Sequence, residues 1–207
     1  MTRNFIKLTI VLLICGFLGR VDAAFARPVC NDRLDARHRQ DVTSAIPCRK
    51  PSSPLLRYVG SVSVPEFDGF FSADNLREGQ PAGRLQITWI GSNFRKHFLR
   101  KIESHGPARE LDAYQLKVFA NDSAIINDIG RPVEVTLHDV WILLNRQLHG
   151  EHGLLRTDAR PNVFYVRDSL GKLWAVDTVW GGAGWELGAS RLDDPRLWHE
   201  EINVISR

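Results

Sequence analysis

The string His-Gly-Glu-His at residues 149–152 holds the side chains best suited to chemistry. His149, Glu151 and His152 place two imidazoles and a carboxylate within four residues, and His138 lies earlier on the same expected helix. Such groups bind zinc or transfer protons. The HExxH zinc motif keeps its ligands on one helix face, whereas Gly150 interrupts the helix here. We therefore predict structural histidines and no metal or other cofactor, with His149, Glu151 and His152 as weak metal-site candidates.

Other catalytic patterns do not occur in this sequence. It contains no G-x-S-x-G nucleophile elbow, no P-loop and no G-x-G-x-x-G loop, so we assign no catalytic residue. Six tryptophans could suggest a sugar-binding surface. However, Trp174, Trp180 and Trp185 share one strand face with aliphatic residues, which favours core packing over ligand stacking.

The first 26 residues have the order of a secretion signal. Arg3 and Lys7 precede an apolar run over residues 8–18, and Ala24-Phe25-Ala26 fits the small-residue cleavage pattern. Arg20 and Asp22 end the apolar run before it reaches the roughly 20 residues of a membrane-spanning helix. We predict cleavage after Ala26, no transmembrane anchoring after cleavage, and a periplasmic or extracellular location.

Export changes the charge balance of the chain. Removal of residues 1–26 lowers the net charge from +3 to about +1, so the mature chain has no broad cationic field for nucleic acid. Two cysteines, Cys30 and Cys48, remain. An even pair in an exported chain predicts a disulfide, although both could remain unpaired in a loose leader. Residues 27–56 are polar and proline-rich and form the expected N-terminal arm; residues 57–207 form the expected single domain.

Several local patterns predict the first half of this domain. Residues 58–64, 84–90 and 115–120 have the composition or alternation of strands. Residues 66–83 carry Gly, Pro and Asp around three phenylalanines and predict a loop. A helix is expected after Ser92-Asn93, because Phe94, Phe98 and Ile102 recur at four-residue spacing before Gly106-Pro107.

The clearest local pattern predicts a helix over residues 137–149. Thr136 and Asp139 have the spacing of a capping box, and Gly150 is placed to end the helix. One face is apolar at helical spacing, through Leu137, Val140, Trp141, Leu144 and Leu148.

The C-terminal third predicts an antiparallel meander with a defined register. If residues 168–172 and 181–184 are loops, then Arg167 opposes Leu173 and Trp180 opposes Trp185. The other pairs follow: Phe164 with Val176, Val166 with Trp174, Thr178 with Leu187, and Val176 with Ala189. These residues share one mostly apolar face, which needs a cover. We therefore expect an α+β fold, an antiparallel β-meander with one or two helices packed on its apolar face, extended by a strand over 202–205.

Three segments also resemble a family of small uncharacterised bacterial proteins. They are IGSNFRKHFLRKIE from Ile90, NVFYVRDSLGKLWAV from Asn162, and GWELGA from Gly184 with the ending NVISR. The family pattern has a GxNF...FL helix, a FYVRDxxGxLxAV hairpin and an RVFSR-like tail. The resemblance implies a bacterial origin and supports the meander, and it implies no activity and no site.

Three functions are compatible with these patterns. We favour a non-enzymatic exported domain that binds a protein or a cell-envelope component. The first alternative is an envelope-polymer hydrolase that uses histidines and carboxylates near residues 149–152, which predicts that they converge in a pocket. The second is a structural or assembly component of an envelope machine, which predicts a large exposed apolar patch.

Overall fold

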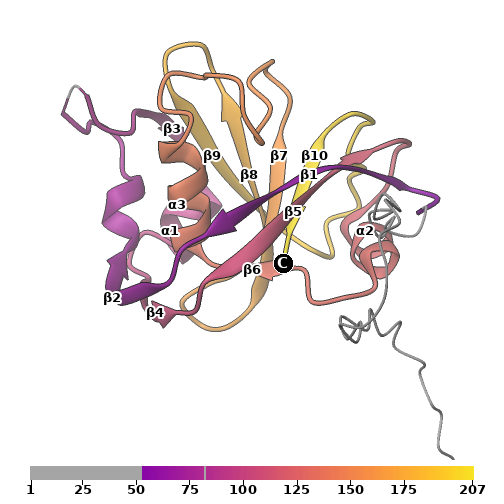
Figure 1. Cartoon of the computed structure of the whole chain (residues 1–207), viewed down its shortest axis with the longest axis horizontal. Helices are drawn as coiled ribbons and strands as arrows, with labels where there is room; N and C mark the ends of the chain where they lie inside the picture. The colour runs from indigo at the N-terminus through magenta and orange to yellow at the C-terminus, as the bar shows by residue number, and fades with distance from the viewer. Residues whose placement is uncertain (1–52, 82) are drawn as a thin grey trace, which may run out of the picture. The chain divides into compact units, whose positions relative to one another are not determined.

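The computed structural model describes residues 53–81 and 83–207. The predicted signal peptide 1–26, both Cys30 and Cys48, and most of the arm 27–56 lie outside the described residues. The described part is an α+β fold with 18% helix and 40% strand, as the sequence predicts. Figure 1 shows its elements in chain order: β1 (Leu56–Val64), β2 (Phe67–Ser72), the 3-10 helix η1 (Ala73–Leu76), β3 (Ile87–Ile90), α1 (Ser92–His97), β4 (Ile102–Gly106), β5 (Arg109–Leu116), α2 (Asp122–Ile129), β6 (Glu134–Val135), α3 (Leu137–Asn145), β7 (Asn162–Arg167), β8 (Leu173–Trp180), β9 (Trp185–Arg191) and β10 (Asn203–Ser206).

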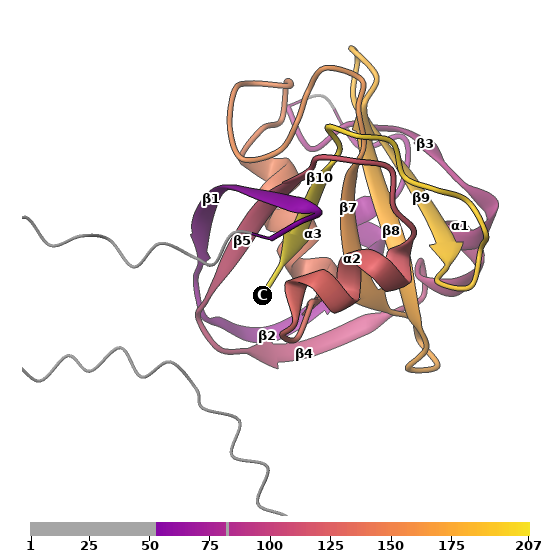
Figure 2. The same ribbon diagram turned by 90° about the vertical axis from the view of Figure 1, so that its right-hand side faces the viewer.

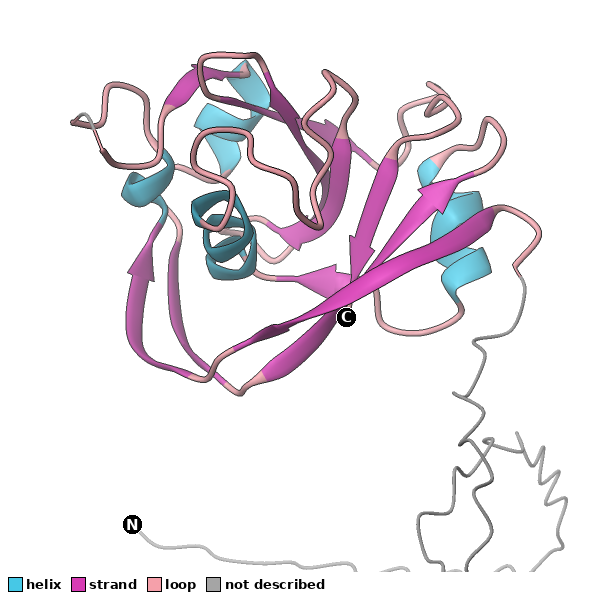
Figure 3. Cartoon of the chain, turned by 45° about the horizontal axis from the view of Figure 1, so that its top comes forward, coloured by secondary structure: helices cyan, strands magenta, loops and turns pink. Residues whose placement is uncertain are grey.

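Eight of the described strands form one sheet in the order β1-β5-β10-β7-β8-β9-β3, with β6 paired to β7. Most pairs are antiparallel, whereas β10 and β6 run parallel to β7, and β3 runs parallel to β9. β2 and β4 form a separate antiparallel pair, which Figure 3 shows beyond the ends of β1 and β5. The sheet is therefore mixed rather than wholly antiparallel.

The predicted register of the meander is confirmed at every pair. Arg167 opposes Leu173 and Trp180 opposes Trp185 at the two turns. Between them, Phe164 pairs with Val176, Val166 with Trp174, Thr178 with Leu187, and Val176 with Ala189. Two loop lengths determine the whole set because strand side chains alternate with a period of two.

Helices cover both faces of the meander (Figures 1 and 2). α3 packs on the predicted apolar face, where Leu137, Val140 and Leu144 join Phe164, Val176 and Trp185 in one core cluster. α2 covers the opposite face, where Ile125 packs with Val163, Tyr165 and Ala175 in a second cluster. The sequence predicted the packing of α3 on the apolar face, and it did not predict the cover of the opposite face by α2.

Four predicted elements have different bounds. The strand predicted over 84–90 is limited to β3, and the strand predicted over 115–120 overlaps only the end of β5. The loop predicted over 66–83 contains β2, because Phe67, Phe70 and Phe71 pair with β4. The strand predicted over 202–205 is β10, displaced by one residue.

Both predicted helices are shorter than expected. α1 ends at His97, and Ile102 begins β4 rather than a further helical turn. α3 begins with the predicted capping box, in which the Thr136 side chain accepts from the backbone N–H of Asp139 and the Asp139 side chain accepts from that of Thr136. It ends at Asn145, and Gly150 follows with φ of 72°. His149 therefore lies outside the helix.

Candidate functional site

The His-Gly-Glu-His string does not form a metal centre in the described structure. His149, Glu151 and His152 are all exposed in the turn that follows α3. The Glu151 carboxylate accepts from the backbone N–H of His149 at 2.9 Å, and this hydrogen bond lowers the pKa of Glu151. Across residues 53–81 and 83–207, no group of three His, Cys, Asp or Glu side chains is placed to hold a metal ion.

His138 is part of the core rather than of this string. His138 is 6% exposed, and its ring stacks on that of Phe67 with the ring centroids 4.2 Å apart. Its Nδ1 has no hydrogen-bond partner among the described residues. Burial lowers the pKa of His138, which favours a neutral ring among its aromatic neighbours Phe67, Phe71 and Trp141.

The predicted core role of the meander tryptophans is confirmed. Trp174 and Trp185 are buried, and Trp141 and Trp180 pack against the same cluster. Trp198 is also buried, on the opposite face of the sheet. Trp89 on the edge strand β3 is 52% exposed. The meander tryptophans therefore stabilise the sheet and do not form a ligand platform.

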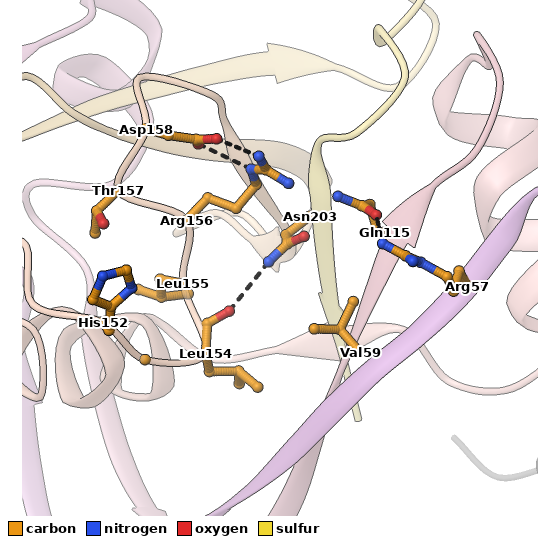
Figure 4. Close-up of a pocket in the computed structure, with 11 residues that line it drawn as sticks. Arg57, Val59, Gln115, His152, Leu154, Leu155, Arg156, Thr157, Asp158 and Asn203 are labelled. Carbon is orange, nitrogen blue, oxygen red and sulfur yellow. Dashed lines mark hydrogen bonds and ion pairs between the residues drawn. The ribbon is translucent and has the colours of Figure 1, made fainter.

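A polar hollow lies beside the turn that carries His152 (Figure 4). It measures about 300 Å³ and lies between the segment 152–158 and the strands β1, β5 and β10. Its lining combines guanidinium, amide, imidazole and hydroxyl groups with a few apolar side chains: Arg57, Val59, Gln115, His152, Gly153, Leu154, Leu155, Arg156, Thr157, Asp158 and Asn203.

A polar row crosses four strands, and three of its members, Arg57, Gln115 and Asn203, line this hollow. Arg57 on β1 pairs in register with Gln115 on β5, which pairs with Asn203 on β10. Asn203 in turn pairs with Asn162 on β7. Paired residues point to the same face of a sheet, so these four side chains lie in line. The row runs from the exposed Arg57 to the fully buried Asn162.

The two buried asparagines attach the opposite wall of the hollow to the sheet. Asn203 donates to the carbonyl of Leu154 at 3.1 Å. Asn162 accepts from the backbone N–H of Arg156 at 2.7 Å and donates to its carbonyl at 3.0 Å. Each of these side chains satisfies backbone groups of an irregular segment that would otherwise be costly to bury.

Gln147 supports the same wall from behind. Its amide nitrogen donates to the carbonyls of Glu151 and Leu155 at 2.7 and 3.0 Å, and its oxygen accepts from the N–H of Leu155 at 2.9 Å. Gly153 lies so close that a Cβ there would be 2.5 Å from the Gln147 amide. Three side-chain amides therefore preorganise the wall of the hollow.

Two acceptor side chains that line the hollow, Asp158 and Gln115, already have partners within the chain. Arg156 donates from Nε to Asp158 at 2.9 Å and from Nη2 to its second oxygen, and this pairing lowers the pKa of Asp158. Arg57 donates to the side-chain oxygen of Gln115, and no carboxylate of the described chain pairs with Arg57. The Arg57 guanidinium is therefore a cation of the hollow without a carboxylate partner in the described chain, and it fits an anionic or acceptor-rich group.

A second polar cluster lies on the other face of the sheet and is closed. The fully buried Asp122, at the start of α2, accepts from Trp198 Nε1 at 2.8 Å and from the Tyr165 hydroxyl at 3.0 Å. Its second oxygen has no partner among the described residues. Burial raises the pKa of Asp122 more than these two hydrogen bonds lower it.

The connection between β9 and β10 completes that cluster. Arg196 stacks over Trp198 with 4.2 Å from its Cζ to the ring centroid, donates to Ser190, and lies 4.0 Å from Asp177. Burial raises the pKa of Asp177, whose carboxylate packs on Gly188. The described arrangement holds the 192–202 segment to the sheet, and we assign it a structural role.

Sequence reasoning missed most of the hollow. His152 was the one lining residue among the predicted candidates. Asn162 and Asn203 meet only because β10 inserts parallel to β7, and no local pattern predicts that pairing. A signal was nevertheless present, because a polar residue at the start of each of two apolar strands needs a buried partner.

Comparisons with known proteins add no relative. No family model, no curated protein and no solved structure matches this chain. Within the described ranges, none of the helices has the length and apolar character needed to cross a bilayer.

Proposed function

We propose that this protein is an exported, non-enzymatic domain that binds a partner protein of the cell envelope, holding an acidic side chain of that partner in the polar hollow. One observation carries the proposal: a hollow of about 300 Å³ beside the exposed strand β1 is lined by the guanidinium of Arg57, which has no carboxylate partner among the described residues. Hydrogen bonds from a guanidinium to a carboxylate are among the stronger ones in proteins, so Arg57 is the expected anchor.

The hydrolase alternative has less support from the geometry. It requires His149, Glu151 and His152 to converge on a substrate. Only His152 lines the hollow, and Glu151 is engaged with the His149 backbone. The assembly alternative requires one large apolar patch. The exposed large apolar side chains of the described chain are spread over several elements, among them Phe70, Trp89, Phe119 and Leu170.

Export and the disulfide are part of the same proposal and concern residues outside the described ranges. Intact mass of the protein from an expressing host tests both. Loss of residues 1–26 supports export, and a 2 Da increase on reduction supports a bond between Cys30 and Cys48. An uncleaved chain with two free thiols would contradict both.

The binding proposal is tested with capped pentapeptides rather than with an unknown partner. The probe is acetyl-Thr-Val-Glu-Val-Thr-amide, and its control carries Lys in place of Glu. We expect the Glu peptide to bind at least about tenfold more tightly, since one charge-assisted hydrogen bond contributes about 1.5–3 kcal/mol. Amide chemical shifts of the isotopically labelled full chain measure both affinity and location.

Two variants assign the effect to the hollow. Arg57→Gln removes the guanidinium and should remove the preference for Glu over Lys. Arg84→Gln, at an exposed position away from the hollow lining, is the matched control and should keep it. Equal binding of both peptides by the unmodified chain, or an unchanged preference in Arg57→Gln, would overturn the proposal.

A further inference from the structure

Among the described strands, β1 is one of the two edges of the large sheet. Its inner side pairs with β5, so its outer side offers backbone donors and acceptors to any strand that can reach them. The hollow opens beside this strand, because Arg57 and Val59 of β1 line it. Whether the outer N–H and C=O groups of β1 can still form hydrogen bonds therefore determines whether a ligand chain could pair with this strand.

The pairing pattern shows which β1 residues face outward. The Leu116 backbone bonds to the β10 side, through its N–H to Ile202 and its carbonyl to Glu201. In an antiparallel pair, bonded and non-bonded residue pairs alternate, so Asp112 and Glu110 also direct their backbone groups toward β10. Their partners on β1, Ser61 and Ser63, therefore direct theirs away from β5.

Both ends of this outer row are already occupied by groups of the same chain. At the start of β1, the N–H of Leu56 donates to the hydroxyl of Ser53 at 2.7 Å. Near its end, Arg146 donates to the carbonyl of Ser63 at 2.8 Å. These two contacts limit strand pairing to the middle of β1.

The middle of β1 contains a bulge beside the hollow. The register shifts between Tyr58 and Gly60, so Val59 has no partner on β5. Bulges are frequent next to functional sites, where they redirect a side chain. Val59 is 49% exposed and lines the hollow. Ser61 therefore has an outward-facing backbone beside the bulge, and Val59 places this part of the edge next to the hollow that Arg57 lines.

The opposite edge of the sheet, β3, has fewer backbone groups available to an added strand than β1. β3 has four residues, and the N–H of its last residue, Ile90, donates to the carboxylate of Glu78 at 2.9 Å. The lining of the polar hollow contains no β3 residue. Pairing at β3 also lacks the charge complementarity that Arg57 provides.

From these observations we infer that the partner is a short extended acidic segment that adds as a strand along residues 59–61 of β1 and directs its carboxylate to Arg57. This inference rests on the proposed function and specifies how the ligand lies. Main-chain hydrogen bonds supply part of the affinity and the hollow supplies selectivity for the acidic side chain. Blocked ends restrict the added strand to a few residues, so the edge does not recruit long strands.

The test uses backbone N-methylation of the same Glu pentapeptide with the full chain. In an extended peptide, alternate N–H groups point to the same side. Two methylated peptides are made, one in each alternate phase. We expect one phase to lose at least about tenfold in affinity, because its N–H groups can no longer donate to β1. The unmethylated peptide should also protect the Ser61 amide from hydrogen exchange.

A variant pair tests the same contact from the protein side. Ser61→Pro removes the outward N–H, which the β5 pairing does not use and which an edge strand can lose. Ser61→Ala keeps that N–H and removes only the hydroxyl contact with Glu110. We expect weaker binding by Ser61→Pro and unchanged binding by Ser61→Ala.

The outcomes separate the inference from the proposed function. If both methylated peptides bind as tightly as the parent while the preference for Glu over Lys remains, the strand addition is wrong and the hollow still binds the acid. If the preference for Glu is absent, the proposed function itself is wrong. Should Ser61→Pro fail to fold, the methylated peptides still decide the matter.

Discussion

The two faces of the central meander are both buried, yet they are built in different ways. Toward α3, Phe164, Val176 and Trp185 alternate along neighbouring strands and meet an apolar helix face. Toward α2, apolar residues share the surface with Asp122 and Asp177, which need Tyr165, Trp198 and Arg196 to satisfy them. Apolar periodicity therefore determines one face, and a polar network determines the other.

The largest expected effect is on the apolar face. Phe164 is fully buried under α3, and Phe164→Ala should lower the free energy of unfolding by about 3–5 kcal/mol through lost burial and a cavity. Denaturant unfolding measures it. Leu170→Ala is the control, since Leu170 is 86% exposed and its truncation should cost less than about 0.5 kcal/mol. A loss near the control value would mean that this face tolerates repacking.

A second test addresses the polar face. A Cβ at Gly188 would lie 2.6 Å from both carboxylate oxygens of Asp177. Gly188→Ala should therefore lower the free energy of unfolding by about 1–3 kcal/mol by overpacking. At Gly60 the nearest atom would be Leu154 Cδ1 at 3.7 Å, so Gly60→Ala is a control with ordinary contacts. Equal effects of the two changes would show that the Asp177 carboxylate moves freely.

The caps of the two covering helices allow a matched comparison. Thr136 caps α3 within a capping box and also accepts from Arg109 at 3.1 Å, whereas the exposed Asn121 caps α2 alone. Thermal unfolding should show a loss of about 1–2 kcal/mol for Thr136→Ala and about 0.5–1 kcal/mol for Asn121→Ala. The reverse order would place more of the stability in the α2 layer.

The sequence predicts the first face well for a physical reason. Strand side chains have a period of two, so two short loops determine the register of the three strands that follow Pro161. The capping box of α3 is likewise local, because Thr136 and Asp139 are three residues apart. Features that depend on near neighbours in the chain are accessible without a structure.

The second face and the hollow depend on distant pairings. We expected one apolar face, although the unbroken apolar run 163–166 is typical of a strand buried on both sides. β2 was missed because its partner, β4, lies in a segment expected to be helical. Asn162 and Asn203 come together only through the parallel pairing of β7 with β10. None of these contacts follows from local propensity.

The smallest expected effect concerns the pH dependence of the polar face. Burial raises the pKa of Asp122 above its usual value despite the hydrogen bonds from Trp198 and Tyr165. A carboxyl whose pKa is higher in the folded state binds its proton more tightly there, so its contribution to stability is present in acid and is lost as pH rises through that pKa. Asp122→Asn keeps an acceptor oxygen and does not titrate.

The difference in unfolding free energy between Asp122→Asn and the unmodified chain should therefore shift in favour of the variant as pH rises from about 4 to about 8. Denaturant unfolding at several pH values, with Asp177 left in place in both proteins, measures this shift. A constant difference would mean that Asp122 ionises as it does in the unfolded chain. A shift in the opposite direction would mean that the Trp198 and Tyr165 hydrogen bonds stabilise the Asp122 carboxylate more than burial destabilises it. The polar face would then stabilise the fold most at neutral pH.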